Sequence, residues 1–190
     1  MISGGRLSMD RMFKVVVCGP GAVGKTALCH RFETGKFEED YWPTVGCSIY
    51  VLNIEIRGVD VRLVVWDLAG QSRYDPLRSS YYSNAHALIL VYDVSREATA
   101  TAAGHYFTSE LSSLLGIRCF ILVGNKTDIK PLVSFASGLE ALIIKSYPKR
   151  FLHILTSAKK NENVQTLFRE TAECLLGSSH INAQQSGSMW

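Results

Sequence analysis

The stretch from Gly19 to Thr26 constrains the fold of this 190-residue chain more than any other part of it. It reads Gly-Pro-Gly-Ala-Val-Gly-Lys-Thr and matches the pattern G-x-x-x-x-G-K-[S/T], which average residue frequencies produce in roughly 1% of chains of this length. It follows the β-branched run 13–18, which predicts a buried strand, and it opens a helix expected over 25–33. This order predicts a loop whose backbone amides bind phosphate groups.

Two side chains of this loop have expected roles. The Lys25 ammonium would reach the terminal phosphates of a nucleotide, and the Thr26 hydroxyl would bind magnesium. Pro20 lacks an amide hydrogen, but it lies before the amides expected to contact phosphate. The loop therefore predicts a magnesium nucleotide site and leaves the identity of the base open.

The rest of the chain alternates apolar strands with helical segments. Strands around 49–56 and 61–66 flank a Gly58-Val59-Asp60 turn, which predicts an antiparallel hairpin. Further strands are expected over 87–92, 118–123 and 151–155, and helices near 74–83, 98–115, 138–147 and 163–176. The pattern predicts an α/β P-loop NTPase domain of three layers, with a six-stranded, mostly parallel sheet, one antiparallel edge strand and about five helices.

Length and composition favour one folded domain. With 47% hydrophobic and 19% charged residues, the chain can form an ordinary core. We expect a flexible leader over 1–11, the folded domain over 12–176 and a flexible polar tail over 177–190. The net charge of +3 is too small to indicate nucleic-acid binding without a clustered basic face. The longest apolar stretch, 85–92, is far shorter than the roughly 18 residues of a membrane span.

The five cysteines are widely spaced, at Cys18, Cys29, Cys47, Cys119 and Cys174. Their odd number and the absence of a C-x-x-C pair fit neither a disulfide framework nor a zinc site. We therefore expect reduced cysteines and a reducing compartment.

The segment Asn125-Lys126-Thr127-Asp128 follows an apolar strand at the end where open α/β sheets bind ligands. A carboxylate there can accept hydrogen bonds from the ring N–H and the exocyclic amine of guanine, two groups that adenine does not present together. The segment predicts that Asp128 selects guanine. The alternative is a polar loop that caps a helix.

The segment from Asp67 to Gln71 follows the strand expected over 61–66. Its pattern D-x-x-G is common by chance, so its position carries the interpretation. A carboxylate there can hold the magnesium shell through water, the Gly70 amide can contact the γ-phosphate, and Gln71 can orient the attacking water. The alternative is a strand that ends in a tight turn.

The order of these motifs resembles the small GTPases of the Ras superfamily. The matching segments are 19–26, Pro43-Thr44, 67–71, 125–128 and Thr156-Ser157-Ala158-Lys159, and the resemblance covers about residues 13–176. That span would be the small GTPase domain.

Within the superfamily the chain looks closest to the Rab branch. The segments that carry this likeness are 43–46, 66–74, 81–82 and 90–93. The phosphate loop itself looks equally like that of Rho proteins.

The resemblance implies roles for two switch loops. Thr44 would bind magnesium and contact the γ-phosphate, while Asp67, Gly70 and Gln71 would form the second switch. Gly21 is small enough to leave room for an arginine supplied by an activating protein.

The resemblance also implies how the base is held. Phe37 would pack against guanine, Tyr41 would close over the phosphates, and the stem of Lys126 would lie near the base. The backbone of Ala158 and Lys159 would support the guanine oxygen. For Phe37 and Tyr41 the alternative is aromatic packing at the surface.

Three residue sets follow. Catalysis would depend on Gln71, Lys25, Thr44 and Gly70. The metal ligands would be Thr26, Thr44 and Asp67. The nucleotide-binding set would be Gly21, Ala22, Val23, Gly24, Lys25, Thr26, Ala27, Phe37, Tyr41, Thr44, Gly70, Asn125, Lys126, Asp128, Ser157, Ala158 and Lys159.

The implied protein is a GTPase that binds GTP or GDP with Mg²⁺ and acts as a nucleotide-dependent switch, in Rab-like membrane trafficking or signalling. Its implied partners are an effector, an exchange factor and an activating protein, bound through the switch loops. Leu68, Ser72 and Ile49 depart from the family pattern and affect the identity of those partners. No cysteine follows Cys174, so we expect no prenylation site, and we expect a cytoplasmic protein recruited to membranes by partners.

Two other functions remain open on the residues alone. A GTP-binding adaptor or scaffold with little turnover would fit Leu68, Ser72 and the missing lipid anchor. A P-loop ATPase or nucleoside kinase is opposed by residues 125–128 and by a chain too short for a substrate lid domain.

Overall fold

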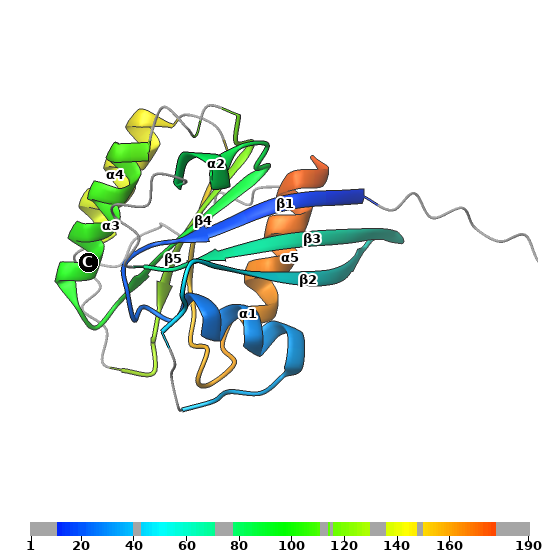
Figure 1. The fold of residues 1–190 in the computed structure, drawn as a ribbon, viewed down its shortest axis with the longest axis horizontal. Helices are drawn as coiled ribbons and strands as arrows, with labels where there is room; N and C mark the ends of the chain where they lie inside the picture. The colour runs from blue at the N-terminus through cyan, green and yellow to red at the C-terminus, as the bar shows by residue number, and fades with distance from the viewer. Residues whose placement is uncertain are drawn as a thin grey trace, which may run out of the picture.

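A computed structural model describes residues 11–39, 43–70, 78–110, 114, 116–129, 136–147 and 150–177 of the chain. These residues form one sheet with helices on both faces (Figure 1). Along the chain the elements are β1 (Arg11–Cys18), α1 (Lys25–Thr34), β2 (Cys47–Ile56), β3 (Val59–Leu68), α2 (Arg78–Tyr82), β4 (Ala87–Asp93), α3 (Glu97–Glu110), β5 (Cys119–Asn125), α4 (Ala136–Ser146), β6 (Arg150–Leu155) and α5 (Val164–Leu176).

The sheet has six strands in the order β2-β3-β1-β4-β5-β6. Strand β1 pairs in parallel with both β3 and β4, and β4, β5 and β6 continue the parallel pairing. Only the edge strand β2 is antiparallel, and it pairs with β3 from Cys47 opposite Leu68 to Ile56 opposite Val59. The six-stranded sheet with one antiparallel edge and the layered α/β class are confirmed.

Alternate residues of the central strands face two separate cores. On β1, Val15 and Val17 belong to the core under α1 and α5, which also contains Phe168. The neighbouring Val16 belongs to the core under α3 and α4, which contains Phe107. Because both faces are covered, β4 and β5 are buried at every position. Within the described part of the chain, no helix is long and apolar enough to span a membrane.

The parallel strands direct the polar loops to one edge of the sheet. Strands β1, β3, β4, β5 and β6 all run the same way, so the loops that follow them lie together. These loops contain the phosphate-binding segment and the segments after residues 68, 93, 125 and 155. The topology thus assembles sequence-distant motifs into one region.

Element boundaries differ slightly from the expected ones. Strand β1 begins at Arg11, the last residue of the expected leader. The hairpin turn lies at Arg57 and Gly58, both with positive φ, while Val59 and Asp60 belong to β3. The hairpin is confirmed, and its strands are longer than expected because their pairing continues to the turn.

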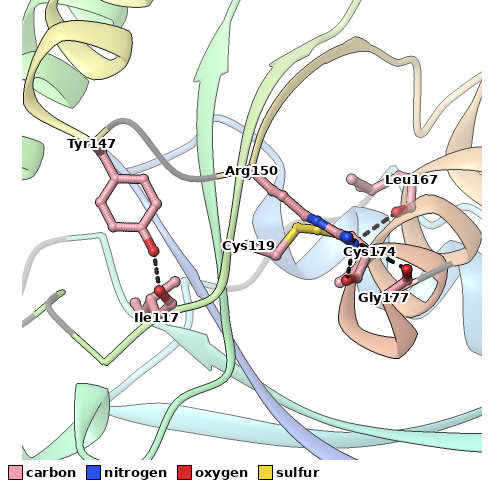
Figure 2. Close-up of a disulfide and its surroundings, with 8 residues drawn as sticks. Ile117, Cys119, Tyr147, Arg150, Leu167, Cys174 and Gly177 are labelled. Carbon is pink, nitrogen blue, oxygen red and sulfur yellow. Dashed lines mark hydrogen bonds between the residues drawn. A yellow bond between two sulfur atoms is a disulfide. The ribbon is translucent and has the colours of Figure 1, made fainter. Parts of the chain in front are cut away.

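The expectation that all five cysteines are unpaired is wrong. Cys119 and Cys174 form a disulfide across 55 residues of sequence, with their Cα atoms 6.3 Å apart (Figure 2). Cys18, Cys29 and Cys47 take no part in a disulfide. The pairing could not be read from sequence spacing, because it arises only when α5 packs beside the start of β5.

Candidate magnesium and guanine nucleotide site

Two glycines give the phosphate-binding loop its shape. Gly19 and Gly24 have φ angles of 132° and 94°, in the region that glycine adopts without strain. A Cβ on Gly19 would lie 2.2 Å from the Val91 carbonyl oxygen, and one on Gly24 would lie 2.4 Å from Asn125 Nδ2. The loop can therefore pack against β4 and β5 only with glycine at these positions.

Lys25 is held inside the loop it follows. Its Nζ donates to the carbonyl oxygens of Gly19 at 3.0 Å and Pro20 at 2.9 Å, and the residue is only 6% exposed. Burial lowers the pKa of Lys25, and the nearby Asp67 carboxylate opposes that shift. The ammonium is thus fixed at the mouth of the loop, where phosphate oxygens are expected.

Three expected metal ligands come together beside Lys25. The Thr26 hydroxyl donates to Asp67 Oδ2 at 2.5 Å and lies 2.7 Å from the Thr44 hydroxyl oxygen. Asp67 is fully buried, and burial raises the pKa of its carboxyl group. Its second oxygen, Oδ1, has no hydrogen-bond partner among the described residues.

This cluster fits a hard divalent cation. A buried carboxylate oxygen without a partner is costly unless a cation or a donor reaches it. Magnesium prefers oxygen ligands, and Thr26, Thr44 and Asp67 provide hydroxyl and carboxylate oxygens within one cluster. Within the described residues, no group of three His, Cys, Asp or Glu side chains offers another metal site.

Gly70 lies against the phosphate-binding loop. A Cβ at this position would be 2.4 Å from the Gly21 backbone nitrogen and 2.5 Å from the Pro20 carbonyl carbon. The Tyr106 hydroxyl of α3 donates to the Gly70 carbonyl oxygen at 2.7 Å. Sequence reasoning missed Tyr106, because nothing in the chain pattern links α3 to this glycine.

The two switch segments also meet through the backbone. The Ala69 amide donates to the Gly46 carbonyl oxygen at 2.9 Å, next to the pairing of Cys47 with Leu68. The segment that carries Thr44 is therefore tied to the segment that carries Asp67.

A pocket of about 390 Å³ lies beside the phosphate-binding loop. Its lining comes from the start of α1, the segment after α1, and the loops after β5 and β6. The lining residues are Ala22, Gly24, Ala27, Phe37, Glu38, Glu39, Asn125, Lys126, Asp128, Ile129, Ala158 and Lys159. Because the lining combines aromatic, apolar and charged groups, the pocket suits a flat, polar ring.

Asn125 connects three loops at the back of this pocket. Its Nδ2 donates to the Val23 carbonyl oxygen at 2.9 Å, while its Oδ1 accepts from the Thr156 hydroxyl at 3.1 Å and from the Ala158 amide at 3.2 Å. The residue is 1% exposed. Its main role in the structure is to position the other groups.

Asp128 is oriented by a neighbour. Its Oδ1 accepts from the Ser157 hydroxyl at 2.6 Å, and the residue is half-buried at the pocket wall. The carboxylate keeps acceptor capacity for the N–H groups of a base.

Lys126 is anchored by Ala22, an expected site residue, and by Asp93, which was not among the expected site residues. Its Nζ donates to the Ala22 carbonyl oxygen at 2.7 Å and pairs with Asp93 Oδ2 at 2.9 Å. Arg96 pairs with the same carboxylate at 3.0 Å and also donates to Ala22. Burial raises the pKa of Asp93, but its Ser95 and Lys126 partners outweigh that effect and the net shift is downward. The sequence feature that could have indicated Asp93 is its position at the end of an apolar strand, where the polar loops of the site meet.

An exposed ion pair lies at the pocket mouth. Lys159 Nζ is 2.9 Å from Glu39 Oε1, and it joins the segment after α1 to the loop after β6. The Arg31 guanidinium donates to the Lys159 carbonyl oxygen at 3.1 Å. Such exposed pairs contribute little to stability, so this pair is easily opened.

The structure therefore brings the expected residues into two adjoining groups, one around Lys25 and one around Asn125. Val23 takes part through its carbonyl group, since its side chain lies in the core. Tyr41 and Gln71 lie outside the described residues, and their roles stay predictions.

Comparison with known proteins gives consistent matches. The sequence profile of the Ras family matches residues 14–176. The Ras-related protein SEC4 of Saccharomyces cerevisiae is 34% identical over 173 residues, which cover 91% of this chain and 79% of that protein. The human Ras-related protein Rab-30 is 32% identical over 173 residues, covering 91% and 84%. The human Ras-related protein Rab-17 is 33% identical over 180 residues, covering 93% and 82%.

Proposed function

This chain belongs to the Ras family of small GTPases, with relatives in the Rab branch, and we propose that the two adjoining groups of residues form its hydrolytic and base-recognition sites. Members of this family bind GTP and GDP with Mg²⁺, and this chain is such a GTPase, acting as a switch in Rab-like trafficking. The observation that carries the residue assignment is the cluster of Thr26, Thr44 and Asp67 beside the buried Lys25 ammonium.

The proposed catalysis is mainly positioning and charge stabilisation. Lys25 holds a fixed positive charge where negative charge develops on the transferred phosphoryl group. Bound Mg²⁺ supplies further positive charge to the phosphate oxygens. Gln71 orients the attacking water, and the Gly70 amide contacts the γ-phosphate.

The same residues explain how the protein switches. Thr44 and Gly70 lie on two segments that β2–β3 pairing and the Ala69 bond to Gly46 hold together. Both segments gain contacts with the γ-phosphate side of the nucleotide and lose them after hydrolysis. We propose that effectors, exchange factors and activating proteins bind these two segments, and that partners recruit the protein from the cytoplasm to a membrane.

The assignment of the hydrolytic residue is tested by Gln71→Leu. We expect single-turnover hydrolysis of bound GTP to fall at least about tenfold, because leucine cannot orient water, with GTP affinity changed by less than about twofold. The measurement is the conversion of bound GTP to GDP, followed by chromatography. Gln165→Leu makes the same exchange at an exposed position on α5 and is expected to keep the wild-type rate. An unchanged rate in Gln71→Leu contradicts the role given to Gln71.

The magnesium assignment is tested by Asp67→Asn. Because burial raises the pKa of Asp67, the ionised carboxylate destabilises the cation-free protein at neutral pH, and this cost disappears as the pH falls below that pKa. We expect the variant to melt about 2–4 °C higher in GDP and EDTA, for a gain of about 1 kcal/mol. We also expect Mg²⁺ to lose most of its effect on GDP release.

The matched control for this experiment is Asp60→Asn, an exposed position on the same strand. It is expected to keep the wild-type difference in GDP release between Mg²⁺ and EDTA. If Asp67→Asn keeps that difference as well, Asp67 does not belong to the magnesium site.

A further inference from the structure

The disulfide joins two elements at the amino-terminal end of the parallel strands. The nucleotide site lies at the other end, where these strands end. Cys119 is the first residue of β5, and Cys174 lies in the last turn of α5 (Figure 2). Their Cα separation of 6.3 Å lies within the range of about 4.4–6.8 Å that suits a disulfide. The fold itself therefore holds the two sulfurs ready to pair.

The two cysteines differ in their access to a pocket. Both belong to the core cluster that contains Phe168, where Cys119 is 0% and Cys174 5% exposed. Of the two, Cys174 also lines a pocket of about 430 Å³, whose described lining does not include Cys119. A small molecule that enters the pocket would meet Cys174 first.

The pocket is positively charged. Its described lining consists of Arg118, Arg150, Cys174, Leu175 and Gly177. The Arg150 guanidinium donates to the carbonyl oxygens of Cys174 at 2.9 Å and Gly177 at 3.4 Å, which fixes it at the end of α5 (Figure 2). Arg118 is exposed. Two guanidinium groups that line the same pocket as Cys174 attract an anion to it.

We propose that Cys119 and Cys174 form a reversible thiol–disulfide pair, and that the arginine-lined pocket at Cys174 admits a small thiol or disulfide carrying carboxylates, such as glutathione. Cys174 is the exchanging sulfur and Cys119 is the resolving one. The pair thereby adds a modification site that is separate from the nucleotide-binding residues.

The disulfide opens in two exchange steps. The thiolate of a small thiol attacks Cys174 Sγ, the bond to Cys119 breaks, and Cys119 leaves as a thiolate that takes a proton from water. A second small thiol attacks the small-molecule sulfur of the mixed disulfide and releases the Cys174 thiolate. Two electrons pass from two small thiols to the protein, and one small disulfide forms. The reverse sequence closes the bond.

The order of attack is tested with full-length variants. After reduction and removal of the reductant, Cys119→Ser treated with glutathione disulfide is expected to accumulate a glutathione adduct on Cys174, located by peptide mass spectrometry. Cys174→Ser is the matched variant, and its Cys119 should react at least about tenfold more slowly because it is enclosed. Cys29, which is also fully buried and unpaired, serves as an internal standard for unfolding.

The role of the pocket charge is tested with Arg118→Gln. Opening of the wild-type disulfide by glutathione is expected to slow at least about threefold in this variant, and opening by uncharged 2-mercaptoethanol by less than about 1.5-fold. Arg62→Gln, an exposed arginine on β3, should leave both rates unchanged. Arg150 is unsuitable because it also holds the end of α5.

Three results would overturn the proposal. One is adduct formation on Cys119 as fast as on Cys174. Another is a reaction that appears only together with modification of Cys29, which would show that exchange requires unfolding. The third is an equal response of Arg118→Gln to charged and uncharged thiols. If Cys119→Ser does not fold, trapping the mixed disulfide during opening of the wild-type bond answers the same question, since it must be found on Cys174.

Discussion

Asp128→Asn is expected to lower the affinity for GTP by about 100- to 1,000-fold and to raise the affinity for xanthosine triphosphate. In the role proposed for Asp128, the carboxylate would accept two hydrogen bonds from guanine, each worth about 1.5–3 kcal/mol because one partner is charged. The amide of asparagine replaces one acceptor with a donor, which faces the guanine amine unfavourably. Xanthine has a carbonyl group at that position and can accept from the new donor. Competition binding with the two triphosphates measures the change.

Glu162→Gln is the matched control for this prediction. Glu162 accepts from Thr127 at 3.1 Å in the same pair of loops, but it does not line the pocket. Its conversion to an amide should change GTP affinity by less than about twofold. A preference for GTP that survives in Asp128→Asn would mean that another group reads the base.

Lys25→Ala is expected to weaken GTP and GDP binding at least about 100-fold. Removing one partner of a buried charged interaction costs about 2–5 kcal/mol, and about 1.4 kcal/mol corresponds to a factor of ten. Lys25 is 6% exposed and its ammonium group is fixed by two loop carbonyl groups, so it is preorganised for phosphate rather than free to move. Equilibrium titration with labelled GDP measures the loss.

Lys145→Ala provides the comparison, since this lysine is exposed on α4 and far along the chain from the phosphate-binding loop. Its nucleotide affinity should equal that of the wild type. Near-wild-type affinity in Lys25→Ala would contradict the assignment of the phosphate site. Thermal unfolding without nucleotide establishes that a loss of binding in Lys25→Ala is not a loss of folding.

The fold was predictable because its signals are local and repeated. The apolar run of β5 is buried at every position, and the alternation along β2 and β3 gave the hairpin. Parallel strands with the phosphate-binding loop after the first one then fix where the polar loops meet. Within the described residues, the ends of elements differ from the expected ones because pairing and caps extend beyond the apolar pattern.

The site was predictable where a short motif names its residues. Thr44 lies 18 residues after Thr26 in the sequence, and Asp67 lies 41 residues after it. The topology of the sheet brings the three side chains together. The supporting contacts were not predictable. The bond from Tyr106 to Gly70 and the pairing of Asp93 with Lys126 depend on side-chain directions that only the packed structure defines.

The disulfide was missed for a related reason, since sequence spacing does not show which distant cysteines meet. The disulfide also closes part of the chain into a covalent ring and leaves the rest outside it. The covalent ring between Cys119 and Cys174 contains Asn125, Asp128 and Ser157, whereas the phosphate-binding loop lies outside it. A protease that cuts once inside the ring therefore leaves two fragments joined through sulfur, and a cut before the ring releases the phosphate-binding part from the base-binding part. The two halves of one nucleotide site thus differ in how easily degradation can separate them from the rest of the protein.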